Sequence, residues 1–259
     1  MHQPRSILIT GASSGIGAAL ALSYARAGVS LFLAGRNVVR LSEIAQACTA
    51  RGAVVEEQVV EVTNSSTMAA WITEAHATAP LDLVIANAGI SAGTSDGEHA
   101  EPEYQVRRLF AVNVDGALNT VLPALPLMQR RGRGQIALMS SMAGFRGLAG
   151  ASAYCATKAA VRVLGEGMRG TVAASGIEVS VICPGYVRTP MTAANRFTMP
   201  FLMDANRAAR IIQSGLARNR SRIAFPLRMY WMLWLLQILP VALTDAIVAR
   251  LPRKTPVAN

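Results

Sequence analysis

The stretch Thr10-Gly11-Ala12-Ser13-Ser14-Gly15-Ile16-Gly17 directly follows an apolar run over Ser6–Ile9 and opens a helical pattern. Its glycines permit a tight turn and let the backbone approach a ligand closely. A helix that begins there offers unpaired N–H groups and a partial positive charge, which together attract phosphate. The glycine spacing is GxxxGxG rather than GxGxxG. Its position between strand and helix nevertheless predicts a phosphate-binding turn, formed by Gly11, Ser13, Ser14, Gly15, Ile16 and Gly17.

Downstream of this turn, short apolar runs alternate with longer helical patterns. The expected strands are Ser6–Ile9, Ser30–Leu33, Val54–Val59, Leu83–Ile85, Gln135–Met139, Glu178–Ile182 and Arg222–Ala224. The expected helices cover residues 16–27, 38–50, 65–77, 104–130, 153–174 and 205–218. This alternation is typical of βαβ units with right-handed crossovers. The sequence therefore predicts an α/β fold: one doubly wound parallel sheet of the Rossmann type over residues 1–226, with a C-terminal helical extension over 227–259.

Composition argues against several kinds of site. The three cysteines, Cys48, Cys155 and Cys183, form no CxxC pair, and His2, His76 and His99 do not cluster with them or with paired carboxylates. We expect neither a metal site nor disulfides, and reduced thiols are the default. Only residues 1–6 precede the first apolar run, which is too short for a signal peptide. The sequence thus predicts a cytoplasmic protein.

The net charge of +10 is concentrated in the last third of the chain. Residues 1–178 carry 14 basic and 13 acidic side chains, whereas residues 179–259 carry 11 basic and 2 acidic ones, Asp204 and Asp245. Such an asymmetry favours an anionic surface as a partner. Nucleic acid is not expected, because the basic residues lack interleaved polar side chains that could read bases.

The extension contains an uncharged apolar stretch, Met229–Leu243, whose single polar side chain is Gln237. It is shorter than the roughly 20 residues that cross a bilayer. Tyr230, Trp231 and Trp234 suit the headgroup level of a membrane. Basic residues flank the stretch on both sides: Arg218, Arg220, Arg222 and Arg228 before it, and Arg250, Arg253 and Lys254 after it. This pattern favours peripheral contact with the inner face of a membrane. A helix packed over a substrate pocket or at a subunit interface is the alternative.

The end of the second expected strand, Ala34-Gly35-Arg36-Asn37, indicates which dinucleotide the turn binds. A carboxylate at this position would bind the 2′-hydroxyl of an adenosine ribose. Here no acid is present, and Arg36 can pair with a 2′-phosphate. The loop therefore favours NADP(H) over NAD(H), although Arg36 as a solvated loop residue is the simpler alternative.

A second group of polar residues carries the expected chemistry. Tyr154 and Lys158 are four residues apart on one expected helix, so their side chains share a face. A neighbouring ammonium and a positive nicotinamide ring would lower the pKa of the phenol and suit it to proton transfer. Ser141 stands at the end of an expected strand, where hydroxyls face the crevice that binds substrates. It can hydrogen-bond a substrate oxygen, whereas we expect neighbouring Ser140 to be structural.

Together these residues resemble the short-chain dehydrogenase/reductase family, from about residue 5 to residue 225. The matching motifs, in family order, are Thr10–Gly17, Asn87-Ala88-Gly89, Asn113, Ser141, Tyr154 with Lys158, and Pro184-Gly185 with Thr189. The resemblance implies a catalytic tetrad in which Tyr154 transfers the proton and Lys158 lowers its pKa and holds the ribose. Ser141 would orient the carbonyl, and Asn113 would fix a helix backbone and a water that relays protons to Lys158.

The resemblance also implies the remaining cofactor contacts. These are Asn87, Ala88 and Gly89 on the adenosine side, the Val62 backbone near adenine, and Pro184, Gly185, Val187 and Thr189 near the nicotinamide, in addition to Tyr154 and Lys158. Two positions depart from the family pattern. Glu61 stands where the family usually has aspartate, which puts its hydrogen bond to adenine in doubt, and Ala86 replaces a common asparagine with little expected effect.

We therefore expect an NADP(H)-dependent oxidoreductase that transfers a hydride between nicotinamide and a carbonyl or secondary alcohol. The apolar residues between Met191 and Met203 suggest a bulky, lipophilic substrate. A catalytically idle nucleotide sensor and a membrane-surface scaffold are the alternatives, but neither needs the Asn113, Ser141, Tyr154 and Lys158 set. The family's pairing of its two long central helices implies a homodimer or homotetramer.

Overall fold

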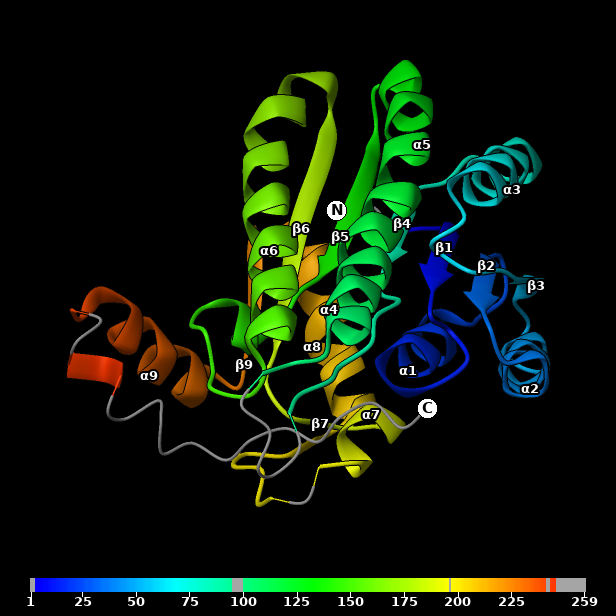
Figure 1. Cartoon of the computed structure of the whole chain (residues 1–259). Coiled ribbons are helices and arrows are strands. Elements are labelled where there is room, and N and C mark those ends of the chain that lie inside the picture. Colours follow the sequence, from blue (N-terminus) through cyan, green and yellow to red (C-terminus); the bar gives the residue numbers. More distant parts are fainter. Residues whose placement is uncertain (1–2, 95–99, 196, 241–242, 246–259) are drawn as a thin grey trace.

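A seven-stranded parallel sheet forms the centre of the fold in the computed structural model, which describes residues 3–94, 100–195, 197–240 and 243–245. The strand order is β3-β2-β1-β4-β5-β6-β9 (Figure 1). The strands are β1 (Ser6–Thr10), β2 (Ser30–Gly35), β3 (Val54–Val59), β4 (Leu83–Ala86), β5 (Gly134–Met139), β6 (Ile177–Pro184) and β9 (Arg222–Phe225). The predicted α/β fold is confirmed, and each expected strand overlaps an observed one.

Helices cover both faces of the sheet (Figure 1). On one face, α1 packs against α2 and α8, and on the other face α3 packs against α5 and α4 against α6. Their bounds are α1 (Gly15–Tyr24), α2 (Val38–Thr49), α3 (Ser65–Thr78), α4 (Glu103–Phe110), α5 (Gly116–Arg131), α6 (Ser152–Val172) and α8 (Ala205–Ala217). Two apolar clusters, one on each face, fill the space between sheet and helices. Strands β1 and β4 are buried along their whole length, which explains their continuous apolar runs.

The strand order reverses between β1 and β4, the neighbours at the centre of the sheet. The connection after β1 leads toward β2 and β3, whereas the one after β4 leads toward β5 and β6. In a doubly wound sheet a crevice opens at such a reversal, outside the carboxyl ends of the strands. The fold therefore places a binding site beside the turn that follows β1.

The helix expected over residues 104–130 is interrupted by a local change of winding. Between α4 and α5 the chain forms a π-helical turn over Ala111–Asp115, which includes Asn113. Such wide turns are uncommon and are frequent at functional sites. Periodicity does not distinguish one from a continuous α-helix, so the sequence predicted the helical extent but not this turn.

The segments after β6 contain more regular structure than expected. A short two-stranded sheet joins β7 (Val187–Arg188) to β8 (Met203–Asp204), and α7 (Pro190–Ala193) lies between them. Beyond β9, α9 (Leu227–Ile238) begins the extension and has no buried residue. No helix within the described ranges is long and apolar enough to cross a membrane. Residues 246–259, with Arg250, Arg253 and Lys254, lie outside the described residues.

Two further expectations concern thiols and metals. Cys48, Cys155 and Cys183 are all buried, and none of them forms a disulfide in the described part of the chain. In the part of the chain that the structure describes, no group of His, Cys, Asp and Glu side chains could hold a metal ion. His2 and His99 fall outside that part, so the expectation of no metal site remains a prediction for them.

Candidate active site

A cavity of about 670 Å³ opens at the carboxyl ends of β1, β2, β4, β5 and β6. This volume lies within the 300–1,000 Å³ range of small-molecule sites. All of the expected site residues line it or adjoin it. Those that line it are Gly11, Ser13, Ser14, Gly15, Ile16, Arg36, Val62, Asn87, Ala88, Gly89, Ser141, Tyr154, Lys158, Pro184, Gly185, Val187 and Thr189.

The turn after β1 is shaped to approach a ligand with its backbone. Gly11 has a φ of +67°, and a Cβ there would lie 2.8 Å from Cα of Ala88. The Asn87 side-chain amide donates to the carbonyl oxygens of Thr10, at 2.8 Å, and Gly11, at 3.2 Å. Asn87 therefore braces the turn against β4. Ser14 precedes α1 but does not cap the helix through its side chain. The first N–H groups of α1 are therefore available to a phosphate at the cavity mouth.

Gly17 has a different position from the other residues of the turn. It is buried and does not line the cavity. A Cβ at Gly17 would overlap the Gly11 carbonyl oxygen and lie 2.5 Å from the Asn87 amide nitrogen. A direct contact between Gly17 and a cofactor stays a prediction. Its lack of a side chain lets α1 pack tightly beneath the turn, which is an indirect contribution to the site.

The far end of the cavity carries two arginines. Arg36 follows β2 and lies 3.8 Å from the Glu61 carboxylate, with both side chains about half exposed. Arg40, one turn later at the start of α2, also lines the cavity. Sequence reasoning missed Arg40, although its spacing of four residues from Arg36 would have placed both on one side of a helical start. The arrangement gives this end of the cavity two guanidinium groups and one opposing carboxylate.

Ser141 and Tyr154 meet at the middle of the cavity. Ser141 caps a short 3₁₀ turn after β5, and its hydroxyl accepts a hydrogen bond from the Ala143 N–H at 3.1 Å. Burial raises the pKa of Tyr154 to about 12, while a hydrogen bond with Ser141 acts in the opposite direction. The sequence led us to expect a lowered pKa. That lowering depends in part on the positive nicotinamide ring, so it stays a prediction for the cofactor-bound protein, whereas desolvation keeps the phenol of the free protein protonated at neutral pH.

Lys158 and Asn113 lie on the same side of the cavity, close to Gly89. A Cβ at Gly89 would lie 3.0 Å from Asn113 Oδ1 and 3.2 Å from Lys158 Nζ. The buried Lys158 ammonium donates to the Met139 carbonyl at 3.0 Å and lies 6.0 Å from the centre of the Tyr154 ring. Buried Asn113 binds both backbone groups of Ile90, at 2.8 and 3.0 Å. The structure thus brings the four expected tetrad residues to one site.

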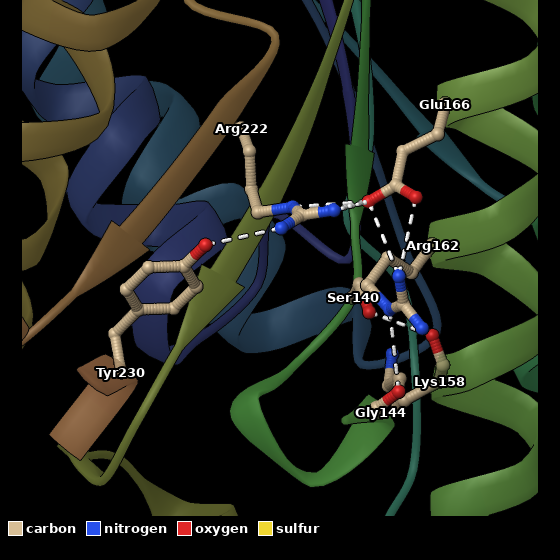
Figure 2. Close-up of polar contacts among 7 residues, drawn as sticks. All are labelled: Ser140, Gly144, Lys158, Arg162, Glu166, Arg222 and Tyr230. Atoms are coloured by element: carbon tan, nitrogen blue, oxygen red, sulfur yellow. Dashed lines mark hydrogen bonds and ion pairs between the residues drawn. The ribbon is translucent and has the colours of Figure 1, made fainter. Parts of the chain in front are cut away.

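A second polar cluster continues along the face of α6 that bears Tyr154 and Lys158. Arg162 and Glu166 follow at further intervals of four residues and form an ion pair at 3.1 Å. Arg222 of β9 also pairs with Glu166 and donates to the Tyr230 hydroxyl of α9 at 3.1 Å, as Figure 2 shows. Arg222 is therefore an internal ion-pair partner, which corrects its assignment to the basic flank of the tail.

An aromatic ring lies close to both guanidinium groups of this cluster. The Arg162 and Arg222 guanidinium carbons lie 4.8 and 5.2 Å from the centre of the Phe145 ring. Arg162 also donates to the Gly144 carbonyl at 3.3 Å, next to the Ser141 turn (Figure 2). Ser140 donates its hydroxyl hydrogen to the Lys158 carbonyl at 2.7 Å, so its expected structural role agrees with the geometry. The cluster ties the Ser141 turn, α6 and α9 together.

The substrate half of the cavity, beyond Ser141 and Tyr154, has mainly apolar walls. They include Met142, Leu148, Tyr186, Pro200, Met229 and Leu233. Met229 and Leu233 come from α9, and a Cβ at Gly185 would lie 2.9 Å from Met229 Sδ. The inner side of α9 thus packs over the pocket. This agrees with the alternative expectation for the extension, a helix packed over a substrate pocket. Sequence reasoning did not identify these wall residues, because only the fold brings α9 next to Gly185.

The chain matches known proteins over nearly its whole length. A family model for "short chain dehydrogenase" matches residues 5–199. An uncharacterized oxidoreductase of Myxococcus xanthus is 40% identical over 248 residues, covering 95% of this chain and 97% of the relative. Ketoacyl reductase HetN of a Nostoc species is 32% identical, covering 76% of this chain and 69% of the relative. The structure of a short-chain dehydrogenase from Sphingobium yanoikuyae in complex with NADPH has a TM-score of 0.78 at 27% identity, and each chain is covered to 98%.

Proposed function

Because the chain belongs to the short-chain dehydrogenase family of oxidoreductases, which use nicotinamide cofactors, we propose that it is an NADP(H)-dependent reductase of bulky, lipophilic carbonyl compounds. The same site would catalyse the reverse oxidation of secondary alcohols. The observation that carries the proposal is the meeting of Ser141, Tyr154, Lys158 and Asn113 in a single cavity with the glycine turn after β1. A nucleotide sensor would not need these side chains together.

The residues of the site suit carbonyl reduction as follows. The cofactor supplies the hydride when bound. The Tyr154 hydroxyl, protonated at neutral pH, donates its proton to the carbonyl oxygen as that oxygen gains charge. Ser141 donates a hydrogen bond to the same oxygen and orients the carbonyl. The Lys158 ammonium favours the phenolate that remains on Tyr154. Asn113, on the same side of the cavity as Lys158, holds the Ile90 backbone in place.

The choice of NADP(H) over NAD(H) rests on the two arginines of the far end. Arg36 and Arg40 both line the cavity, and no carboxylate follows β2 directly. Guanidinium groups bind a 2′-phosphate through charge-assisted, often paired, hydrogen bonds. Glu61 lies 3.8 Å from Arg36, and a bound 2′-phosphate would replace this carboxylate as the partner of the Arg36 guanidinium.

The lipophilic substrate is supported by the apolar walls of the substrate half. Methionine, leucine, proline and tyrosine side chains form these walls, and the methionines among them adapt to ligands of irregular shape. A steroid, retinoid, fatty or sphingoid carbonyl fits this character. The ketoacyl reductase among the relatives is a precedent for an acyl chain.

We propose peripheral membrane contact through the outer side of α9. Trp231, Leu235 and Ile238 share one face at intervals of four and three residues and are 58%, 52% and 58% exposed. Because the exposed side chains of this face are apolar, the outer surface of α9 is suited to burial against lipid. Arg228, exposed on the same helix, would meet anionic headgroups. A lipophilic substrate would then reach the pocket from the bilayer surface.

We also propose a homodimer or homotetramer formed through the long helices α5 and α6. Leu122 on α5 and Val163 on α6 are 54% and 58% exposed, which leaves apolar side chains available for a second copy. Light scattering coupled to size-exclusion chromatography measures the mass. A change of both residues to Ser should shift the oligomer to the monomer.

A carbonyl panel tests the proposed activity. NADPH consumption is followed with an aryl ketone, a steroid ketone and a long-chain oxo compound, and then repeated with NADH. We expect turnover of at least one carbonyl and a lower kcat/KM with NADH. NADPH binding without turnover of any carbonyl would favour the nucleotide sensor, and equal efficiency with NADH would contradict the assigned role of Arg36 and Arg40.

A further inference from the structure

One charged side chain in the substrate half plays no part in the proposed chemistry. The charged residues lining the cavity, within the described ranges, are Arg36, Arg40, Glu61, Lys158 and Arg146. The first three lie at the far end and Lys158 lies beside Tyr154. Arg146 alone follows the Ser141 turn and reaches the apolar substrate half, where an unpaired cation would be costly.

The partner of Arg146 comes from the tail of the chain. Its guanidinium donates to the Asp245 carboxylate at 2.7 Å and to the Thr244 hydroxyl at 3.2 Å. The Arg146 side chain is 20% exposed, whereas that of Asp245 is 64% exposed. The less exposed member of this pair, Arg146, lines the cavity, and the exposed Asp245 carboxylate can leave the pair for water at low cost.

A second observation shows that this guanidinium has unused donor capacity. The Nε atom of Arg146 is inaccessible to solvent and has no hydrogen-bond partner within the described residues. A guanidinium can bind a carboxylate through two parallel hydrogen bonds, and a buried donor without a partner is destabilising. The Asp245 carboxylate thus occupies one edge of the Arg146 guanidinium, and the Nε–H donor of Arg146 remains unsatisfied.

We propose that Arg146 is an anion-binding residue of the substrate cavity and that the substrate carries a carboxylate, which replaces Asp245 on its guanidinium. This inference rests on the proposed carbonyl reductase function and narrows its substrate class to amphipathic oxo acids. Their apolar part contacts the Met229 and Leu233 side of the cavity. The pairing with Asp245 shows that the Arg146 guanidinium binds a carboxylate. Asp245 keeps Arg146 paired while substrate is absent.

Binding of two matched probes tests the proposal without turnover. Decanoate and decanamide have the same chain and nearly the same shape, but only decanoate is charged. Calorimetric titration of the NADPH-saturated protein should give at least tenfold tighter binding of decanoate. R146Q should abolish that preference, and D245N should tighten decanoate binding severalfold without changing decanamide binding.

The control is R107Q, which removes an arginine of an exposed ion pair outside the cavity and should leave both affinities unchanged. Equal binding of the two probes by the wild-type protein would overturn the proposal. A decanoate preference that persists in folded R146Q would also overturn it, as would a D245N protein with unchanged decanoate affinity. None of these results depends on catalysis, so failure of the proposed reductase activity would be recognised separately.

Discussion

Arg222 at the start of β9 pairs with Glu166 on α6, the helix that carries Tyr154 and Lys158 about three and two turns earlier, respectively. Glu166 also binds Arg162, so one carboxylate serves two guanidinium groups that both lie close to the Phe145 ring. All three charged side chains are largely shielded, with exposures from 13% to 32%. Because Arg222 also donates to the Tyr230 hydroxyl, this pairing links α9 to α6.

We expect E166Q to destabilise the protein, because it leaves two shielded cations without an anion. Breaking a fully buried ion pair costs about 3–5 kcal/mol, and the partial exposure here reduces the expected loss to about 2 kcal/mol. Denaturant unfolding measures it. E103Q is the matched control, since the Glu103–Arg107 pair is 78% exposed on both sides and should contribute less than about 1 kcal/mol. Equal losses in the two variants would refute the structural importance of Glu166.

The protonation state of Tyr154 predicts the pH dependence of each direction. A pKa of about 12 keeps the phenol protonated over the ordinary working range. Carbonyl reduction needs the protonated phenol, so its kcat/KM should not fall through loss of that proton between about pH 6 and about pH 10. Alcohol oxidation needs the phenolate and should become faster as the pH rises. A wild-type reduction rate that falls with a midpoint near pH 7, while the protein stays folded over that pH range, would contradict this assignment.

The arginines of the far end predict a cofactor phenotype. R36A combined with R40A should raise the KM for NADPH by at least about tenfold to a hundredfold, since the loss of even one charge-assisted hydrogen bond costs about 1.5–3 kcal/mol. The KM for NADH should change little. R133A, an exposed arginine outside this cavity, is the control. A carboxylate at Gly35 is a poorer test, because a Cβ there would lie 3.0 Å from Ser13 Cβ.

The outer side of α9 predicts lipid binding that can be removed without harming the pocket. Combined Trp231→Ser, Leu235→Ser and Ile238→Ser changes should reduce sedimentation with anionic vesicles, and wild-type binding should weaken as salt is raised. Carbonyl turnover in the absence of vesicles should remain near wild type. Truncation at residue 226 is not equivalent, because it also removes the wall residues Met229 and Leu233. Vesicle binding that is unaffected by the triple substitution would exclude this face as the contact.

The sequence predicted the features that depend on local patterns. Continuous apolar runs such as Leu83–Ile85 marked the buried strands, and the glycine turn marked the crevice. Features set by long-range contacts were not predictable. Nothing near Arg222 in the sequence reveals Glu166 as its partner, and nothing near Gly17 distinguishes a packing role from a ligand contact. Likewise, the raised pKa of Tyr154 follows from burial by several elements, which the spacing of Tyr154 and Lys158 does not express.

The most direct test of the central claim follows the hydride itself. NADPH deuterated at the transferable position of the nicotinamide is incubated with an accepted ketone and either the wild-type protein, Y154F or Y104F, and the alcohol is analysed by mass spectrometry. Tyr104 is exposed and lies outside the cavity, so Y104F controls for loss of a phenol elsewhere. We predict one deuterium on the carbinol carbon with wild type and Y104F, and at least a hundredfold loss of product with Y154F at nearly unchanged NADPH affinity. Alcohol without deuterium, or undiminished product with Y154F, would contradict the account.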